Sequence, residues 1–234
     1  MKNTALLKNR YPYLFKMNSL ALALGSALVL TPLVSGAEKA THVILISCDG
    51  LRPDAVEFLG NQGAPNLHRL IDEGAHTHNA RTDTDFTVTL PNHTAMITGR
   101  GVAGESGHNW IENGTPKLGM HLHKNKKAYL ESMFDVAHDH GLRTALFASK
   151  VKFRLFDISY SEIWANPDTV DTDNGKDKID SFVFIEETDA LITQFLEAVE
   201  EDPFQLSMLH LRDTDTAGHA GGWDIREGSP YLLA

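Results

Sequence analysis

Three short groups of polar residues in this sequence could do chemistry. The first is Asp49, which comes directly after the apolar run HVILISC (residues 42–48) and before Gly50. A carboxylate at the end of a strand can bind a metal ion without being buried in the core, but an aspartate before glycine is also a common turn residue. Asp49 is therefore a candidate metal ligand only if other ligands converge on it.

The second group is the stretch LRDTDTAGHAGGW, in which Asp215 and His219 are four residues apart. If the chain forms a helix there, the two side chains share one face and can hold one cation. A mixed carboxylate and imidazole pair suits zinc, manganese or iron better than magnesium or calcium. A calcium loop that begins at Asp213 fits less well, because Ala217 stands where an oxygen ligand is needed. A purely structural loop is the third interpretation.

The third group is TVTLPNHTAMITGR, residues 87–100. Pro91 near the first turn and Gly99 near the end predict a short helix after a β-rich run. Thr89 then lies at a strand-to-helix corner, beside the free N–H groups where anions bind. Thr89 is either a helix cap or a nucleophile, and the local pattern leaves both open.

These groups must be positioned by a regular fold. We predict strands at residues 42–48, 143–149 and 204–212, and amphipathic helices at residues 64–75, 127–141 and 188–202. Strands that alternate with helices predict an α/β fold, a three-layer α/β/α sandwich with a mostly parallel central sheet. Such folds bind ligands outside the carboxyl ends of the strands, where Asp49, Thr89 and Asp215 are all predicted to lie.

Other side chains that could bind metals are expected to have ordinary roles. Four of the twelve histidines lie in polar surroundings and are predicted to be surface residues: His121, His123, His138 and His140. His76 and His78 alternate on a predicted strand, as expected for a solvated face. Cys48 is the only cysteine, which excludes an internal disulfide, and its apolar run predicts a buried structural thiol.

The N-terminus has the pattern of a secretory signal peptide. Positive residues precede the apolar run LALALGSALVLTPLVSG, and Ser35 and Ala37 are small residues at the expected cleavage positions. We expect cleavage after Ala37, a single domain from residue 38, and a periplasmic or secreted location. An uncleaved anchor is the alternative. No second long apolar run follows, so we expect no membrane contact after removal of the signal.

The charge balance excludes some partners. Loss of residues 1–37 removes four positive charges and changes the formal net charge from −10 to −14. Such an acidic chain repels duplex nucleic acid and anionic membranes. It would also repel a phosphate ester unless a bound metal supplied local positive charge.

Four stretches in order, CDGLRPD, APNLHRLIDEGA, TLPNHTAMITG and DTAGH, resemble the alkaline phosphatase superfamily. The similarity is greatest to the type I phosphodiesterase/nucleotide pyrophosphatase branch and runs from His42 to the last residue. It implies that Asp49 binds one metal ion and that Thr89 is the nucleophile beside that metal. It also implies that Asp215 and His219 bind a second metal, and that both metals are divalent, Zn²⁺ or otherwise Mn²⁺ or iron.

The resemblance also implies a mechanism. Two cations clamp the phosphoryl group of a small phosphate ester while Thr89 attacks phosphorus. Asn113, or alternatively Asn109, stabilises the phosphoryl oxygens together with backbone N–H groups. Residues 38–234 would then be the N-terminal part of one alkaline phosphatase-like catalytic domain.

The sequence departs from the family pattern in two ways. The family completes its metal sites with a later Asp-His pair and a final histidine, and neither follows His219. The pair at Asp139 and His140 comes too early in the chain. We therefore expect a domain incomplete at its C-terminus, with part of its core exposed and little activity alone. Val88 stands where eukaryotic members often carry lysine, which leaves the preference for nucleotides open.

Several functions remain as alternatives to a phosphodiesterase or nucleotide pyrophosphatase. A phosphomonoesterase or phosphonate hydrolase of the same superfamily is one. An inactive, truncated exported binding protein that keeps the fold is another. A sulfatase is disfavoured because no Cys/Ser-x-Pro-x-Arg motif surrounds Cys48 or Thr89. The sequence does not predict the oligomeric state.

Overall fold

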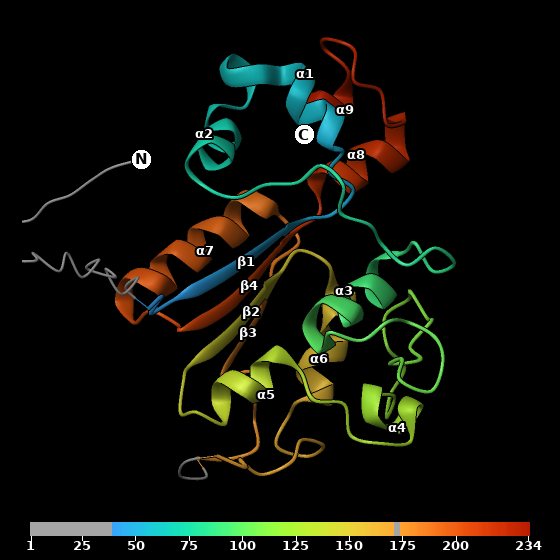
Figure 1. Cartoon of the computed structure of the whole chain (residues 1–234), viewed down its shortest axis with the longest axis vertical. Helices are drawn as coiled ribbons and strands as arrows, with labels where there is room; N and C mark the ends of the chain where they lie inside the picture. The colour runs from blue at the N-terminus through green and yellow to red at the C-terminus, as the bar shows by residue number, and fades with distance from the viewer. Residues whose placement is uncertain (1–38, 171–173) are drawn as a thin grey trace, which may run out of the picture. The chain divides into compact units, whose positions relative to one another are not determined.

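Four strands form one parallel sheet in the computed structural model, which describes residues 39–170 and 174–234. The strands are β1 (Val43–Cys48), β2 (Thr144–Ala148), β3 (Ser181–Phe184) and β4 (Leu206–Leu211). Their spatial order is β1-β4-β2-β3, and all three pairings are parallel (Figure 1). The predicted parallel sheet is confirmed. The four-residue strand β3 was not predicted, because it is too short to show a clear pattern.

Helices cover both faces of this sheet, as the three-layer prediction requires. The helices in the described residues are α1 (Pro53–Gly63), α2 (Pro65–Glu73), α3 (Thr89–Thr98), α4 (Leu122–Lys126), α5 (Met133–His138), the 3₁₀ helix η1 (Val151–Phe153), α6 (Arg154–Ser159), α7 (Thr188–Glu201), α8 (Asp213–Gly221) and α9 (Pro230–Leu233). Figure 1 shows α7 on one side of the sheet and α3, α5 and α6 on the other.

Side chains alternate between the two faces along each strand and feed two apolar clusters. On one face, Phe147 of β2 and Leu209 of β4 pack with Leu191 and Phe195 of α7. On the other face, Leu146 and Met208 pack in a cluster that the helices α3, α5 and α6 complete. These two clusters fix the middle of the sheet, and so they fix the strand ends that carry polar residues.

Strand β1 was predicted to be buried, but much of it is exposed. It is an edge strand paired only with β4 among the described strands, and Val43, Ile44 and Ile46 are exposed. Cys48 is half-buried rather than buried, and partial burial raises the pKa of its thiol. An apolar run of this kind is consistent with a central strand as well as an edge strand, so the sequence pattern could not tell them apart.

The helix predicted at residues 127–141 is much shorter. The Ser132 hydroxyl accepts hydrogen bonds from the backbone N–H groups of Phe134 and Asp135, and the Asp135 carboxylate accepts one from Ser132 N. This reciprocal capping box starts α5 at Met133. The residues before it form irregular structure.

Three histidines predicted to lie on the surface are buried. His121, His123 and His138 are 4%, 8% and 3% exposed, while His140 is exposed. His123 donates from Nε2 to the Ser159 carbonyl (2.7 Å) and accepts at Nδ1 from Leu130 N (3.1 Å). Polar neighbours in the sequence therefore did not indicate exposure, because buried imidazoles find hydrogen-bond partners in the fold: His123 bonds to backbone groups, and His138 bonds to the Asp168 carboxylate.

His76 and His78 are exposed, as predicted, but they lie on no strand. The predicted signal peptide lies outside the described residues. Within the part of the chain that the structure describes, no helix has both the length and the apolar character to cross a membrane.

The short helix α9 begins as the sequence predicts. The Ser229 side chain accepts from Leu232 N (3.3 Å), and Pro230 is the first helical residue. Tyr231 is buried, and its hydroxyl donates to the Gly50 carbonyl (2.7 Å) and accepts from Arg52 N (2.8 Å). A four-residue helix cannot stand alone, so packing against the turn after β1 stabilises it.

Candidate active site

The turn after β1 places Asp49 against the start of α8. Asp49 N donates to the Leu211 carbonyl (2.9 Å), and Thr214 Oγ1 donates to the Asp49 carbonyl (2.6 Å). Gly50 has φ of +73°, and a Cβ there would lie 2.8 Å from Asp215 Cα. Only glycine accepts both the left-handed conformation and this approach. The Asp49 and Asp215 side chains consequently lie close together.

Asp215 and His219 lie on one face of a helix, as predicted. His219 Nε2 is 3.5 Å from Asp215 Oδ1, and the His219 side chain is 72% exposed. The imidazole packs edge-on against Trp223, with ring centroids 4.9 Å apart. Gly218 makes room for that indole, because a Cβ at this position would lie 2.3 Å from the Trp223 ring. The pair is positioned and open to solvent.

Thr89 is the first residue of α3, and its hydroxyl donates to Asp49 Oδ2 (3.1 Å). It does not cap the helix, since the residue at the cap position is Val88. The segment directly before it is irregular and contains no strand, so the predicted helix is confirmed but the predicted strand-to-helix corner is not. His93 joins this helix to β1 through the Thr89 carbonyl (2.7 Å) and the Ser47 hydroxyl (2.8 Å).

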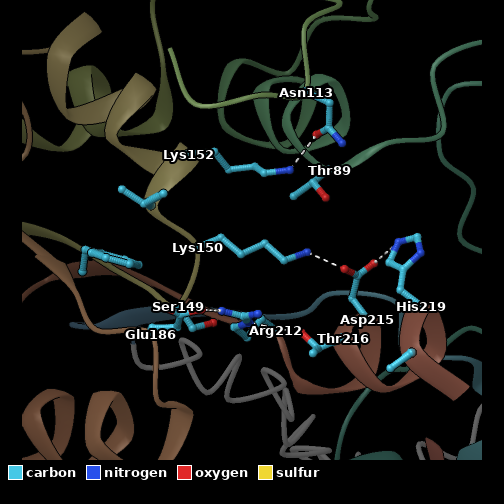
Figure 2. Close-up of a pocket in the computed structure, with 13 residues that line it drawn as sticks. Thr89, Asn113, Ser149, Lys150, Lys152, Glu186, Arg212, Asp215, Thr216 and His219 are labelled. Atoms are coloured by element: carbon cyan, nitrogen blue, oxygen red, sulfur yellow. Dashed lines mark hydrogen bonds and ion pairs between the residues drawn. The ribbon is translucent and has the colours of Figure 1, made fainter. Parts of the chain in front are cut away.

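Lys150, which no sequence motif indicated, lies in the centre of the site. Its Nζ is 2.5 Å from Asp49 Oδ2 and 2.6 Å from Asp215 Oδ2. Figure 2 shows the ammonium pointing toward the Asp215 carboxylate. A usable signal existed, because Lys150 directly follows the predicted strand 143–149, just as Asp49 follows the first strand.

Asn113, predicted to bind phosphoryl oxygens, lies beside the start of α3. Its Oδ1 accepts from Leu90 N (3.0 Å) and from Lys152 Nζ (3.3 Å). This leaves the two N–H donors of the carboxamide for another acceptor. Asn113 lines the same cavity as Thr89, whereas the alternative, Asn109, is not among the residues that line it.

Two cavities meet at these residues. One has a volume of about 610 Å³ and is shown in Figure 2. Its charged lining residues are Lys150, Lys152, Glu186, Arg212 and Asp215. The other has a volume of about 530 Å³ and includes Asp49. Four of the sequence-predicted site residues line both cavities: Thr89, Asn113, Asp215 and His219.

The local charges keep Asp49 ionised. Burial alone would raise the pKa of its carboxyl, but His210 and the Lys150 ammonium outweigh burial and hold that pKa well below its usual range. His210 Nε2 is 3.4 Å from Asp49 Oδ2. Burial lowers the pKa of His210, which favours the neutral imidazole. The carboxylate is therefore a ligand or a hydrogen-bond acceptor rather than a proton store at neutral pH.

The donor atoms at this site fit a divalent metal in type and charge. Carboxylates and imidazoles are ligands that zinc takes in proteins, and Asp49, Asp215 and His219 supply them here. The Asp49 and Asp215 carboxylates already contact one shared positive charge, that of Lys150. Residues 39–170 and 174–234 contain no group of three or more His, Cys, Asp or Glu side chains arranged around one metal position. The predicted ligands instead lie in two pairs. Asp49 contacts Thr89, and Asp215 lies beside His219.

The chain is similar to known proteins in sequence and in fold. The sequence model of the family described as type I phosphodiesterase / nucleotide pyrophosphatase matches residues 43–233. No curated protein matches the chain. The solved structure of murine ectonucleotide pyrophosphatase/phosphodiesterase 5 is similar, with 20% identity, a TM-score of 0.50, and coverage of 82% of this chain and 47% of that chain.

An inactive form of the same murine protein in complex with AMP gives 19% identity, a TM-score of 0.50 and the same coverage, 82% and 47%. At these identities the likeness shows the fold. This chain spans about half the length of these solved structures, given coverage of 47%.

Proposed function

The chain belongs to the type I phosphodiesterase/nucleotide pyrophosphatase family, and from this premise we propose that it hydrolyses phosphodiesters or pyrophosphates with Thr89 as nucleophile. The observation that carries the proposal is the hydrogen bond of 3.1 Å from the Thr89 hydroxyl to Asp49, at a point where Asp215 also converges. A threonine that only began a helix would have no need of two neighbouring carboxylates.

We propose that Asp49 and Thr89 hold one divalent cation and that Asp215 and His219 hold a second, with Zn²⁺ as the expected metal. When bound, these cations supply the positive charge that makes a threonine hydroxyl ionisable and that offsets charge on the phosphoryl oxygens. Asp49 itself is a weak base, because its carboxyl pKa is held low. Its contribution is to orient the Thr89 hydroxyl toward the phosphorus.

The reaction proposed for this chain is a displacement at phosphorus. Thr89 Oγ1 loses its proton to solvent and forms a bond to phosphorus, while the bond to the leaving oxygen breaks and that oxygen departs with the electron pair. Water then cleaves the phosphothreonine and restores the hydroxyl. The free N–H donors of Asn113 would bind a phosphoryl oxygen, since its own oxygen is already engaged by Leu90 N.

A second candidate is a phosphomonoesterase or a phosphonate hydrolase. The larger cavity is lined by Lys150, Lys152 and Arg212 together with Glu186 and Asp215, so three positive side chains face two negative ones. A phosphomonoester dianion carries more negative charge than a diester and would gain more from the excess positive charge. The relative rates on diester and monoester substrates decide between the two candidates.

The test is hydrolysis of bis-p-nitrophenyl phosphate and p-nitrophenyl phosphate with added zinc. We expect Thr89→Ala to lower kcat/KM roughly 1,000-fold or more on the preferred substrate, because the nucleophile is lost. The matched control is Thr98→Ala, on the last residue of the same helix, whose hydroxyl bonds to the Thr94 carbonyl. Equal activity of the two variants would contradict the proposal.

We also propose that the protein is exported after cleavage behind Ala37, and that its partner is a small phosphate ester rather than nucleic acid or membrane. The signal-like N-terminus and the acidic composition support these points. N-terminal sequencing of protein recovered from the periplasm or medium of the producing cells checks the first, and retention of the protein in the cytosol would contradict it.

A further inference from the structure

Lys150 occupies the position between the two carboxylates on which the proposed metal sites depend. Its Nζ contacts Asp49 Oδ2 at 2.5 Å and Asp215 Oδ2 at 2.6 Å, and its side chain is 13% exposed. The three residues follow the ends of three neighbouring strands, β1, β2 and β4. The contact is therefore built by the sheet and does not depend on a flexible surface loop.

The two carboxylates need a neighbouring cation. Their side chains are 13% and 18% exposed, so two negative charges lie close together with little solvent. Like charges in such surroundings raise the free energy of the folded state unless a positive charge offsets them. The other charged cavity residues are engaged elsewhere: Arg212 pairs with Glu186, and Lys152 contacts Asn113. Lys150 supplies the offsetting charge.

The same oxygen atoms are the ones a metal would use. Asp49 Oδ2 accepts the Thr89 hydroxyl as well as the Lys150 ammonium, so a cation held by Asp49 and Thr89 would meet Lys150 directly. Asp215 presents Oδ2 to Lys150 and Oδ1 to His219. A cation held by Asp215 and His219 can use Oδ1 and would disturb Lys150 less. The two half-sites therefore differ in how strongly Lys150 competes for them.

A displaced Lys150 side chain has space to move. It lines the cavity of about 610 Å³, and its four-carbon stem can change rotamer while β2, which ends two residues before it, stays in place. Figure 2 shows the side chain extending across this cavity toward Asp215. Exchange of an ammonium for a metal thus requires a side-chain movement and no change in the sheet.

We infer that Lys150 is a positioning residue that stands in for the metal: its ammonium holds Asp49 and Asp215 together in the metal-free protein, and metal binding at Asp49 and Thr89 displaces it. This inference rests on the metal-dependent function proposed above. Lys150 then preserves the arrangement of the site at the expense of metal affinity, and the metal-free chain stays folded.

The test compares Lys150→Met with Lys152→Met. Both variants remove one positive charge from the same cavity and leave an unbranched side chain, but only Lys150 contacts the carboxylates. Zinc chloride is titrated into each metal-free protein by calorimetry, and the Tm is measured in EDTA. We expect Lys150→Met to lower the Tm in EDTA and to raise zinc affinity about tenfold more than Lys152→Met does.

An equal rise for the two variants would mean that only general charge matters, and would overturn the inference while leaving the proposed metal site intact. Absence of zinc binding in the parent and in both variants would overturn the metal site itself. If Lys150→Met does not fold, side-chain ¹⁵N NMR of the parent protein decides. The inference requires zinc to change the Lys150 Nζ signal while that of Lys152 shifts less, and an unchanged Lys150 signal at zinc saturation contradicts it.

Discussion

Ile46 and Phe147 lie in the same cross-strand row of the sheet, on either side of Leu209, yet their surroundings differ. Ile46 pairs with Leu209 and Leu209 pairs with Phe147 in the parallel register. Phe147 is 1% exposed under α7, whereas Ile46 is 55% exposed. The sheet therefore has a packed region around β2 and β4 and an open region at β1. Asp49 directly follows β1, so one of the two carboxylates of the candidate site is positioned by the less buried strand.

The comparison is tested most strongly by shortening a side chain in each region. We expect Phe147→Ala to lower the free energy of unfolding by about 3–5 kcal/mol, because it empties space between the sheet and α7. Ile46→Ala, in the same row, should cost about 1 kcal/mol or less, since more than half of that side chain is already in water. Urea unfolding measures both. Similar losses for the two variants would mean that β1 is covered in solution.

The second prediction concerns the close contact between the turn after β1, at Gly50, and Asp215 of α8. We expect Gly50→Ala to cost about 2–4 kcal/mol, from backbone strain at φ of +73° and from contact with Asp215 Cα. Gly99→Ala, at the end of α3, is the matched control, because φ is +64° there but a Cβ meets no atom within 4 Å. If both variants lose the same stability in urea, the close approach of the turn to α8 is unimportant.

The smallest expected effect is on the pH dependence of stability, through the buried His123 of α4. Burial lowers the pKa of His123 to about 4, against 6.5 in the unfolded chain, and the charge of nearby His121 acts in the same direction. Between pH 6.5 and pH 4 the unfolded chain binds a proton that the folded chain does not, so stability falls as the pH falls.

We expect His123→Gln to remove about 1–2 kcal/mol of the decline between pH 7 and pH 5, measured by urea unfolding at each pH. His76→Gln, at an exposed histidine, is the control. An unchanged pH profile for His123→Gln would show that His123 already takes up its proton in the folded protein near pH 6.5.

Part of the fold and site could be predicted from the sequence because the signals were local. The strand before Asp49, the helix that carries Asp215 and His219, and the cap at Ser229 all depend on residues within a few positions. The burial of His123 and the short strand β3 could not be predicted, because both depend on segments far away in the chain. The exposure of β1 has the same origin, since no local pattern records which helices cover a strand.

The candidate site shows the same division. Motifs in the right order identified Asp49, Thr89, Asn113, Asp215 and His219, and the structure brings these residues together around two adjoining cavities. Lys150 belongs to none of those motifs, and only the pairing of β2 with β4 shows that its ammonium reaches both carboxylates. No residue near Lys150 in the sequence indicates that it pairs with Asp49, which is 101 residues away.

The hydroxyl of Tyr231 binds the turn at Gly50 across a separation of 181 residues, and this has a consequence for how the protein is made. At ordinary translation rates, roughly 10–40 s separate the synthesis of these two residues. The hydrogen bonds of Asp49 with Lys150 and Thr214 also need residues that are 101 and 165 positions further along the chain. Contacts of such long range form late in folding. The candidate site is thus among the last parts of the protein to assemble.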